Sequence, residues 1–432
     1  MSTHRWLGTT GGALGCAFLL ATSGQAQVGI YGIGELAGAG ENYSEVRAAI
    51  LTSDGSIVAV GGANGQSWDT TANGGGGTSL DTAVLWSKGS GAGVLQALPA
   101  VVDPTIANVG RVVTAGDVTE SSTGTISIAA RSYYGDSHAN AKEQVLYTYS
   151  IAGGTATYGA TTALTPNVNA TGQNAANAIS RDGLVVYGFA QTAAGNVSTR
   201  WTSGTGLVSL GLSGTDVSNI PSGRGVSSDG SLMVGTTTLS DTTTTRAFIY
   251  NSGTSTYTSL GVLAGGTNSQ ALAISADGSK VFGTSESAAH PNGEAFFWTS
   301  GGGFTALGTP NDAWVPNILG GMTADGSAAI VDFDNGTTPN SYLFNSHGMF
   351  ALESVLSSGG VDLTGWSNLQ AQGISPDGRL IYGSGDFGGI TEGFVAEVPA
   401  GLASAIPEPS ADAMLGGLVS LGLVMRLRRR KA

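Results

Sequence analysis

The sequence predicts an all-β fold: a β-propeller of seven four-stranded blades, closed by a strand from the N-terminus. Three observations support this prediction. A short phrase ending in Asp-Gly recurs along the chain, and an aromatic-rich segment follows each copy. Helix signals are almost absent, since 70 of the 432 residues are glycine and no long apolar stripe has a 3.6-residue period. Repeats of about 40–50 residues that each hold four short strands are typical of propeller blades.

The repeated phrase is intact in six copies and degenerate in a seventh. The last four intervals between its aspartates are 47, 48, 48 and 52 residues. The first interval is 128 residues, too long for one unit, and contains a copy with Thr123-Gly124 in place of Asp-Gly. The six turn aspartates are Asp54, Asp182, Asp229, Asp277, Asp325 and Asp377.

Each unit divides into four expected strands. The first strand ends at the phrase, Asp-Gly forms a tight hairpin turn, and a β-branched strand returns. A variable loop then leads to an aromatic-rich strand and a last strand ending in Leu-Gly, as in EAFFWTSGGGFTALG from Glu294. Trp86, Trp201 and Trp298 recur on the third strand, which predicts that they pack in the core between blades.

The two ends of the repeat region predict ring closure. The last unit has a third strand, EGFVAEV, but no Leu-Gly strand, and the segment YGIGELAG from Tyr31 is surplus. A strand around Ile33 to Leu36 is therefore expected to complete the blade that holds Phe394, which leaves only short, protected edges. The propeller is expected to span residues 27–398, with a linker at 399–406.

The first 26 residues have the three parts of a secretory signal peptide: a polar start at His4 and Arg5, an apolar run, and small residues for cleavage after Ala26. Two alternatives are a buried N-terminal helix and a lipoprotein site at Cys16. Cys16 is the only cysteine, so the exported chain would have none. Disulfides, thiolate metal sites and cysteine nucleophiles are thereby excluded.

Residues 407–432 form a three-part tail. Pro407, Glu408 and Pro409 come first, and an apolar stretch from Ala413 to Met425 follows. The stretch is short for a stable membrane span. Cationic residues after such a stretch stay on the cytoplasmic side, which orders the tail as outside, membrane, inside. These cations are Arg426, Arg428, Arg429, Arg430 and Lys431.

This tail resembles the PEP-CTERM sorting signal. The resemblance implies that the partner of the tail is an exosortase, a membrane protease that would cut near Pro407-Glu408-Pro409. It also implies a transient inner-membrane association, followed by release to the cell surface or extracellular matrix of a Gram-negative-type bacterium. A plain tail anchor is the alternative. The repeated phrases resemble the extracellular HAF repeat family and, more weakly, TolB-type propeller repeats, neither of which implies a reaction for this chain.

Charge limits the possible partners. The chain has 17 basic and 30 acidic residues, a net charge of −13. Without residues 1–26 and the residues after Pro409, 11 basic and 29 acidic residues remain, so the mature body is near −18. A surface this acidic repels nucleic acid, and no basic cluster counters it. Extracellular polysaccharide or a surface protein is the expected partner.

Signals for catalysis or cofactors are few. The turn aspartates could suggest calcium, but each unit supplies only one acid, so a turn that needs positive φ is the favoured interpretation. No cofactor or metal is expected. His138 and His290 lie in corresponding loops, with Glu294 near the second. No nucleophile elbow or phosphate loop occurs. The alternatives are a noncatalytic propeller that binds glycan or protein and a propeller enzyme, a hydrolase or lyase acting on polysaccharide.

One repeat position is expected to bind a ligand. Eleven residues before the turn aspartate, units one, six and seven carry Tyr43, Trp314 and Trp366, and these units become neighbours once the ring closes. Trp68 lies in a loop of unit one on what should be the same face. An aromatic row on an acidic surface suits stacking on sugar rings. The alternative is that these side chains fill gaps between blades.

Overall fold

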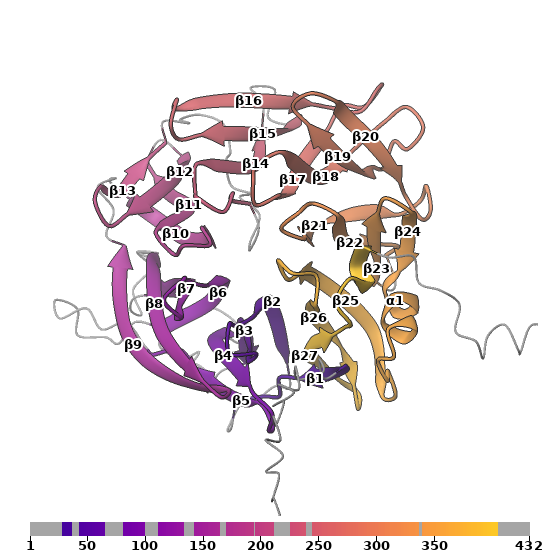
Figure 1. The fold of residues 1–432 in the computed structure, drawn as a ribbon. Helices are drawn as coiled ribbons and strands as arrows, with labels where there is room; N and C mark the ends of the chain where they lie inside the picture. Colours follow the sequence, from indigo (N-terminus) through magenta and orange to yellow (C-terminus); the bar gives the residue numbers. More distant parts are fainter. Residues whose placement is uncertain are drawn as a thin grey trace, which may run out of the picture.

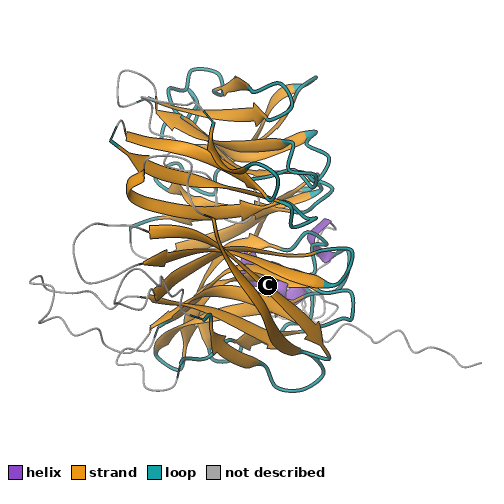
Figure 2. Cartoon of the chain, turned by 90° about the vertical axis from the view of Figure 1, so that its left-hand side faces the viewer, coloured by secondary structure: helices purple, strands orange, loops and turns teal. Residues whose placement is uncertain are grey.

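The described strands form seven small antiparallel sheets arranged in a ring, as Figure 1 shows. The predicted seven-bladed propeller is therefore confirmed. Seen from the side in Figure 2, the strands run between the two faces of the ring. The structure is a computed structural model and describes residues 28–36, 43–64, 81–99, 111–133, 142–164, 170–193, 195–210, 225–238, 244–336 and 339–404.

Blades one to three each have four described strands, named in order from the innermost to the outermost. Blade one consists of β2 (Ser44–Leu51), β3 (Ile57–Asn64), β4 (Asp81–Lys88) and β5 (Val94–Ala97). Blade two consists of β6 (Arg111–Glu120), β7 (Thr125–Tyr133), β8 (Lys142–Ala152) and β9 (Thr155–Leu164). Blade three consists of β10 (Ala170–Ile179), β11 (Val185–Thr192), β12 (Gly195–Thr202) and β13 (Gly206–Ser209).

Blades four to six follow in the same order. The described part of blade four has three strands, β14 (Leu232–Thr238), β15 (Thr245–Asn251) and β16 (Thr256–Gly261). Blade five consists of β17 (Ser269–Ile274), β18 (Lys280–Ser285), β19 (Glu294–Thr299) and β20 (Gly303–Gly308). Blade six consists of β21 (Val315–Met322), β22 (Ala328–Asp334), β23 (Pro339–Asn345) and β24 (Gly348–Ala351).

Blade seven is completed by the N-terminus, as predicted. It consists of β25 (Trp366–Ile374), β26 (Leu380–Phe387), β27 (Ile390–Glu397) and β1 (Gly29–Gly32), which lies outermost. Figure 1 shows β1, in indigo, beside the yellow β27. The position predicted for this strand, Ile33 to Leu36, was wrong by a few residues. The reason is Gly34, whose φ of 76° turns the chain away and whose N–H donates to the Glu392 carboxylate.

The Asp-Gly pairs form turns with positive φ at every glycine, from 67° to 82° across all seven units including Gly124. Unit five shows the geometry. The Gly278 N–H donates to the Ser275 carbonyl at 2.9 Å, and the Asp277 carboxylate accepts from the Ser275 hydroxyl at 2.6 Å. The hydrogen bond from the Ser275 hydroxyl, followed by those from the Ser279 N–H and hydroxyl, lowers the pKa of Asp277 to about 2. The aspartate therefore serves its own turn, which supports the structural interpretation over calcium binding.

Neighbouring turns are joined by a belt of backbone hydrogen bonds. The residue before each aspartate donates its N–H to the corresponding carbonyl of the next blade. The bonds are Arg181 to Ser228 at 3.1 Å, Ser228 to Ala276 at 2.9 Å, Ala276 to Ala324 at 2.7 Å and Ala324 to Pro376 at 2.8 Å. Proline has no N–H, so the pattern stops at Pro376. In blade one the Ser53 N–H donates instead to the Glu120 carboxylate at 2.7 Å.

In four blades the glycine that ends the repeated phrase faces a β-bulge in the inner strand. In blade five the register shifts between Ala271 and Ala273, opposite Gly283. A methyl group on Gly283 would overlap the Gln270 carbonyl oxygen. Gly61, Gly188 and Gly383 meet backbone carbonyls in the same way. In these four blades the bulged strand passes too close for a side chain, which favours glycine. Blade two has Ala130 and blade six has Val331 at the corresponding place.

The core lies between adjacent blades. One cluster joins blades one and two, and another joins blades seven and one through Ile33, Trp86 and Tyr382. A third joins blades six and seven and includes a short helix, α1 (Leu352–Ser358). This helix adds the residues that lengthen the last repeat interval. A 3₁₀ helix, η1 (Leu402–Ser404), lies in the segment expected as a linker, and its Ala403 is buried.

We predict that Gly283→Ala lowers the free energy of unfolding by roughly 1–3 kcal/mol, the usual cost of overpacking. Gly301→Ala is the matched control, because a methyl group there meets no atom within 4 Å. Chemical denaturation of both variants measures the difference. Equal stability of the two would contradict the close approach at the bulge.

Removing β1 should destabilise the whole ring. A chain that lacks residues 28–38 loses the pairing with β27 and the Ile33 side chain, which is only 4% exposed. The expected loss is at least about 3 kcal/mol, from buried apolar contacts and hydrogen bonds together. The control is a chain that begins at residue 28. Identical melting temperatures of the two chains would show that β1 does not close the ring.

Candidate functional site

The aromatic positions expected to bind a ligand lie where inner strands begin, on the face opposite the Asp-Gly turns. Trp366 is the first residue of β25, and Trp314 directly precedes β21. Tyr43 precedes β2 and forms an isolated bridge with Thr391. Trp68 lies outside the described residues. Blades six, seven and one are neighbours in the ring, so this part of the expectation is confirmed.

Trp366 forms the centre of an aromatic surface on blade seven. Its indole ring lies 4.9 Å from the Phe387 ring, with an angle of 37° between the planes, and 5.9 Å from the ring of buried Phe394. Trp366 is half-buried, whereas Phe387 is 40% exposed. Through Trp366 the pair packs against the buried Phe394 ring. The other side of the pair exposes ring surface to solvent.

Polar groups border this aromatic surface. Asn368 has a φ of 52°, and its amide donates to the Asp386 carboxylate at 2.6 Å. The other oxygen of Asp386 accepts from the Thr391 hydroxyl at 3.2 Å. Thr391 is also the bridge partner of Tyr43. These contacts run from Tyr43 through Thr391 and Asp386 to Asn368, two residues after Trp366, at the boundary of blades seven and one.

A buried carboxylate lies next to Tyr43. Glu45 is 5% exposed and accepts from the Tyr43 hydroxyl at 3.1 Å and from the Gln372 amide at 3.2 Å. The Arg47 guanidinium forms an ion pair with the same carboxylate at 2.5 Å. All three donors pair with the same carboxylate, that of Glu45. The network therefore joins blades seven and one and holds Tyr43 in place.

Trp314 is in a different environment. Its ring lies 6.4 Å from the Tyr342 ring, and it packs against the core that blades five and six share. The neighbouring Val315 is 53% exposed. Trp314 thus belongs to blade six, whereas Tyr43 and Trp366 are linked by described contacts. Binding by any of the three residues remains a prediction.

Sequence reasoning missed Asn368, Asp386 and Phe387. Asn368 is nine residues before the turn aspartate and carries no repeat signal. Phe387 ends β26 opposite Trp366, so only the register of this hairpin shows that the two rings meet. Asp386 could have been predicted from its distance along the chain from the Asp-Gly turn, because this distance determines which residues of β25 lie opposite it.

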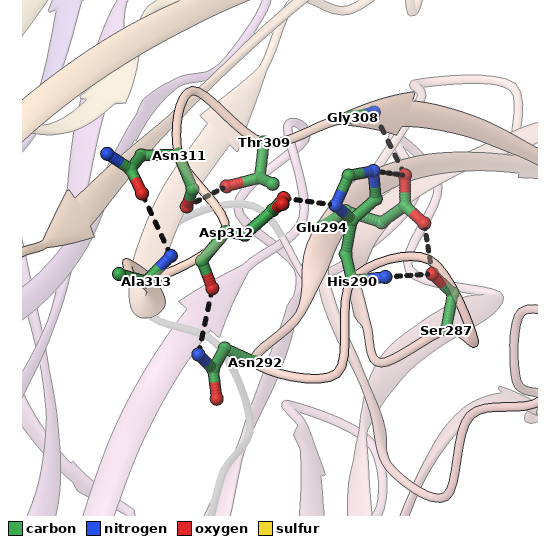
Figure 3. Close-up of polar contacts among 9 residues, drawn as sticks. All are labelled: Ser287, His290, Asn292, Glu294, Gly308, Thr309, Asn311, Asp312 and Ala313. Carbon is green, nitrogen blue, oxygen red and sulfur yellow. Dashed lines mark hydrogen bonds and ion pairs between the residues drawn. The ribbon is translucent and has the colours of Figure 1, made fainter.

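The second candidate centre is a histidine held between two acids, shown in Figure 3. His290 Nδ1 lies 2.7 Å from Asp312 Oδ1, and its Nε2 lies 3.9 Å from Glu294 Oε2. Glu294 is 4% exposed and also accepts from the Ser287 hydroxyl at 2.6 Å and from the Gly308 N–H at 3.1 Å. The backbone N–H of His290 donates to the Ser287 hydroxyl oxygen.

This cluster fastens two loops to each other. Asn292 donates from its amide to the Asp312 carbonyl at 2.8 Å, two residues along from His290. Both imidazole nitrogens face carboxylates. The buried carboxylate, that of Glu294, also accepts hydrogen bonds from Ser287 and Gly308. Such an arrangement fixes the shape of the two loops. His138, its counterpart in blade two, lies outside the described residues.

Across the parts of the chain that the structure describes, no group of three His, Cys, Asp or Glu residues could hold a metal ion. No helix among these residues is long and apolar enough to cross a membrane. Residues 1–26 and the sorting motif Pro407-Glu408-Pro409, with the cations that follow it, lie outside the described residues.

Comparison with known proteins adds solved structures only, because no protein family and no curated protein matches the chain. The chain is similar to TolB from Acinetobacter baumannii at 14% identity and a TM-score of 0.38, over 62% of this chain and 59% of TolB, less than two thirds of its length. It is similar to the C-terminal WD40 domain of Sif2 at 13% identity and a TM-score of 0.42, over 85% of this chain and 98% of that domain. It is also similar to the β-propeller domain of the Trilobed protease from Pyrococcus furiosus at 6% identity and a TM-score of 0.45, over 82% and 96% of the two chains.

Proposed function

We propose that the chain is an exported, noncatalytic propeller of the cell surface or extracellular matrix and that it binds a glycan on the face where the inner strands begin. The observation that carries the binding proposal is the half-exposed ring pair of Trp366 and Phe387, bordered by Asn368 and Asp386. Sugar rings present apolar faces that stack on aromatic rings, and hydroxyls that pair with amides and carboxylates.

Charge favours an uncharged glycan. The exported body is near −18, and the polar border of the aromatic surface contains Asp386. A polyanionic polysaccharide would meet repulsion there, whereas a neutral one would not. The noncatalytic assignment rests on the histidine cluster, whose groups are occupied by each other and by loop hydrogen bonds.

Export and sorting are supported by the two ends of the sequence. The signal peptide at residues 1–26 would direct the chain across the inner membrane. The tail at 407–432 would then hold it there until an exosortase cuts near Pro407-Glu408-Pro409. The protein would leave the membrane and act outside the cell, where polysaccharide surrounds it.

Processing can be read by mass spectrometry of the secreted protein. We expect a chain that lacks Arg428, Arg429 and Arg430, because the cut near Pro409 removes them. Glu408→Ala should leave the uncut protein in the membrane fraction, and Ser410→Ala is the matched control. An intact cationic tail on protein recovered outside the cell would refute exosortase processing.

Glycan binding can be tested without emptying the core. Asn368→Gly keeps the left-handed backbone and removes the amide beside Trp366. We expect affinity for matrix polysaccharide from the producing bacterium to fall about tenfold, the effect of one lost polar contact of about 1.4 kcal/mol. Ser255→Gly, at the other described non-glycine residue with positive φ, is the control. Unchanged affinity of Asn368→Gly would argue against this surface.

The double variant Trp314→Ala with Trp366→Ala complements this test. Both indoles are half-buried and packed, so some loss of stability is expected in addition to any loss of binding. Binding and melting temperature are therefore measured on the same samples. Loss of stability of several kcal/mol with binding kept would show that the two tryptophans only fill space between strands.

A further inference from the structure

A groove on blade five is separate from the aromatic surface of blade seven. It has a volume of about 290 Å³ and lies where β17 begins and β18 ends, beside the start of β21. This approaches the lower limit of small-molecule sites, roughly 300 Å³. The cavity on the ring axis, by contrast, is about 40 Å³, bounded by Ile274, Met322 and Asp117, and has space only for a few waters.

The groove combines one apolar wall with neutral polar groups. The apolar wall is formed by Val315, which is 53% exposed, and Pro316. Gln270 and Thr284 lie opposite each other in the β17–β18 ladder and line the groove. Within the described residues the side-chain amide of Gln270 makes no hydrogen bond. Asn292, from the loop before β19, also lines the groove, and its amide carbonyl accepts no hydrogen bond there.

Charge narrows the class of ligand. Among the described residues that line the groove, Glu286 is the one that is charged. Burial raises the pKa of Glu286, but hydrogen bonds from Thr267 and Asn268 outweigh this and lower it, so the carboxylate is ionised at neutral pH. None of the described residues that line the groove is cationic, so the groove disfavours phosphates, sulfates and uronic acids.

Hydrogen bonds within the protein fix the residues that form the walls of the groove. The Asn268 amide donates to Glu286 at 2.7 Å, and its oxygen accepts the Thr245 N–H at 2.8 Å, which ties β15 of blade four to the groove. On the other side, the contact of His290 with Asp312 and the bond from Asn292 to Asp312 fix the loop that carries Asn292. Binding therefore requires little ordering of the protein.

We propose that the blade-five groove binds one uncharged sugar ring. The apolar face of the ring would lie against Val315 and Pro316, and its hydroxyls would pair with Gln270, Thr284 and Asn292. The inference rests on the proposed glycan-binding function for the class of its ligand, but it names a second site, two blades away from Trp366. A polysaccharide could occupy both sites through different residues of one polymer.

The test uses the secreted protein and soluble neutral oligosaccharides, of β-linked glucose and of N-acetylglucosamine, in titration calorimetry. Oligogalacturonate is the anionic comparison. Gln270→Ala and Asn292→Ala should each weaken binding of a neutral oligosaccharide at least tenfold. Gln96→Ala, a half-buried glutamine on the outer strand of blade one, is the matched control and should bind as the unchanged protein does. Melting temperatures show that each variant is folded.

The outcomes separate this inference from the proposed function. If Asn368→Gly weakens binding and the two groove variants do not, the groove inference is wrong and the blade-seven surface stands. If the groove variants weaken binding and Asn368→Gly does not, the groove is the site and the blade-seven surface is wrong. Equal or tighter binding of oligogalacturonate, or no binding of either neutral oligosaccharide, overturns the groove inference.

Discussion

The pairing of β1 with β27 is the contact on which the rest of this ring depends. Residues joined by this pairing are as far apart as Gly29 and Glu397, so the first residues of the body complete its last blade. Each blade buries its apolar side chains against its neighbours, and a gap at one boundary would expose the cores on both sides. Such distant pairing also makes folding slow, since the loop must close before the contact can stabilise anything.

Repetition is what made the architecture predictable from sequence. Six Asp-Gly phrases, one degenerate copy and the surplus strand at the start predicted the blade number and the closure, because both depend on local turn chemistry and on counting. The exact bounds of the first strand were misplaced, since the Leu-Gly ending suggested Ile33 to Leu36 while Gly34 ends the pairing earlier. The contact of Asn368 with Asp386 depends on the register of the β25–β26 hairpin, which two bulges shift, and the contact of His290 with Asp312 depends on loops that do not repeat. No repeated pattern predicted either contact.

The two faces of the ring have different physical characters. On the face that carries the Asp-Gly turns, hydrogen bonds between successive turns leave few backbone groups free to bind a ligand. On the other, loops of unequal length bring different side chains to the start of each inner strand. The aromatic surface of blade seven and the groove of blade five both lie there, at places where the blades differ from one another. Function on a propeller is expected where repetition fails, because identical units present identical surfaces.

The antiparallel arrangement of β1 and β27 also has a mechanical consequence. Gly29 lies opposite Glu397, so the chain enters and leaves the propeller at the same end of this strand pair. A force pulling the two ends apart would load the hydrogen bonds one after another, as in opening a zipper, rather than all at once in shear. If the propeller is instead attached through one terminus and bound to a polymer on its binding face, the tension passes through whole blades. The ring is thus weak between its own termini and resists tension between a single tether and a bound polymer.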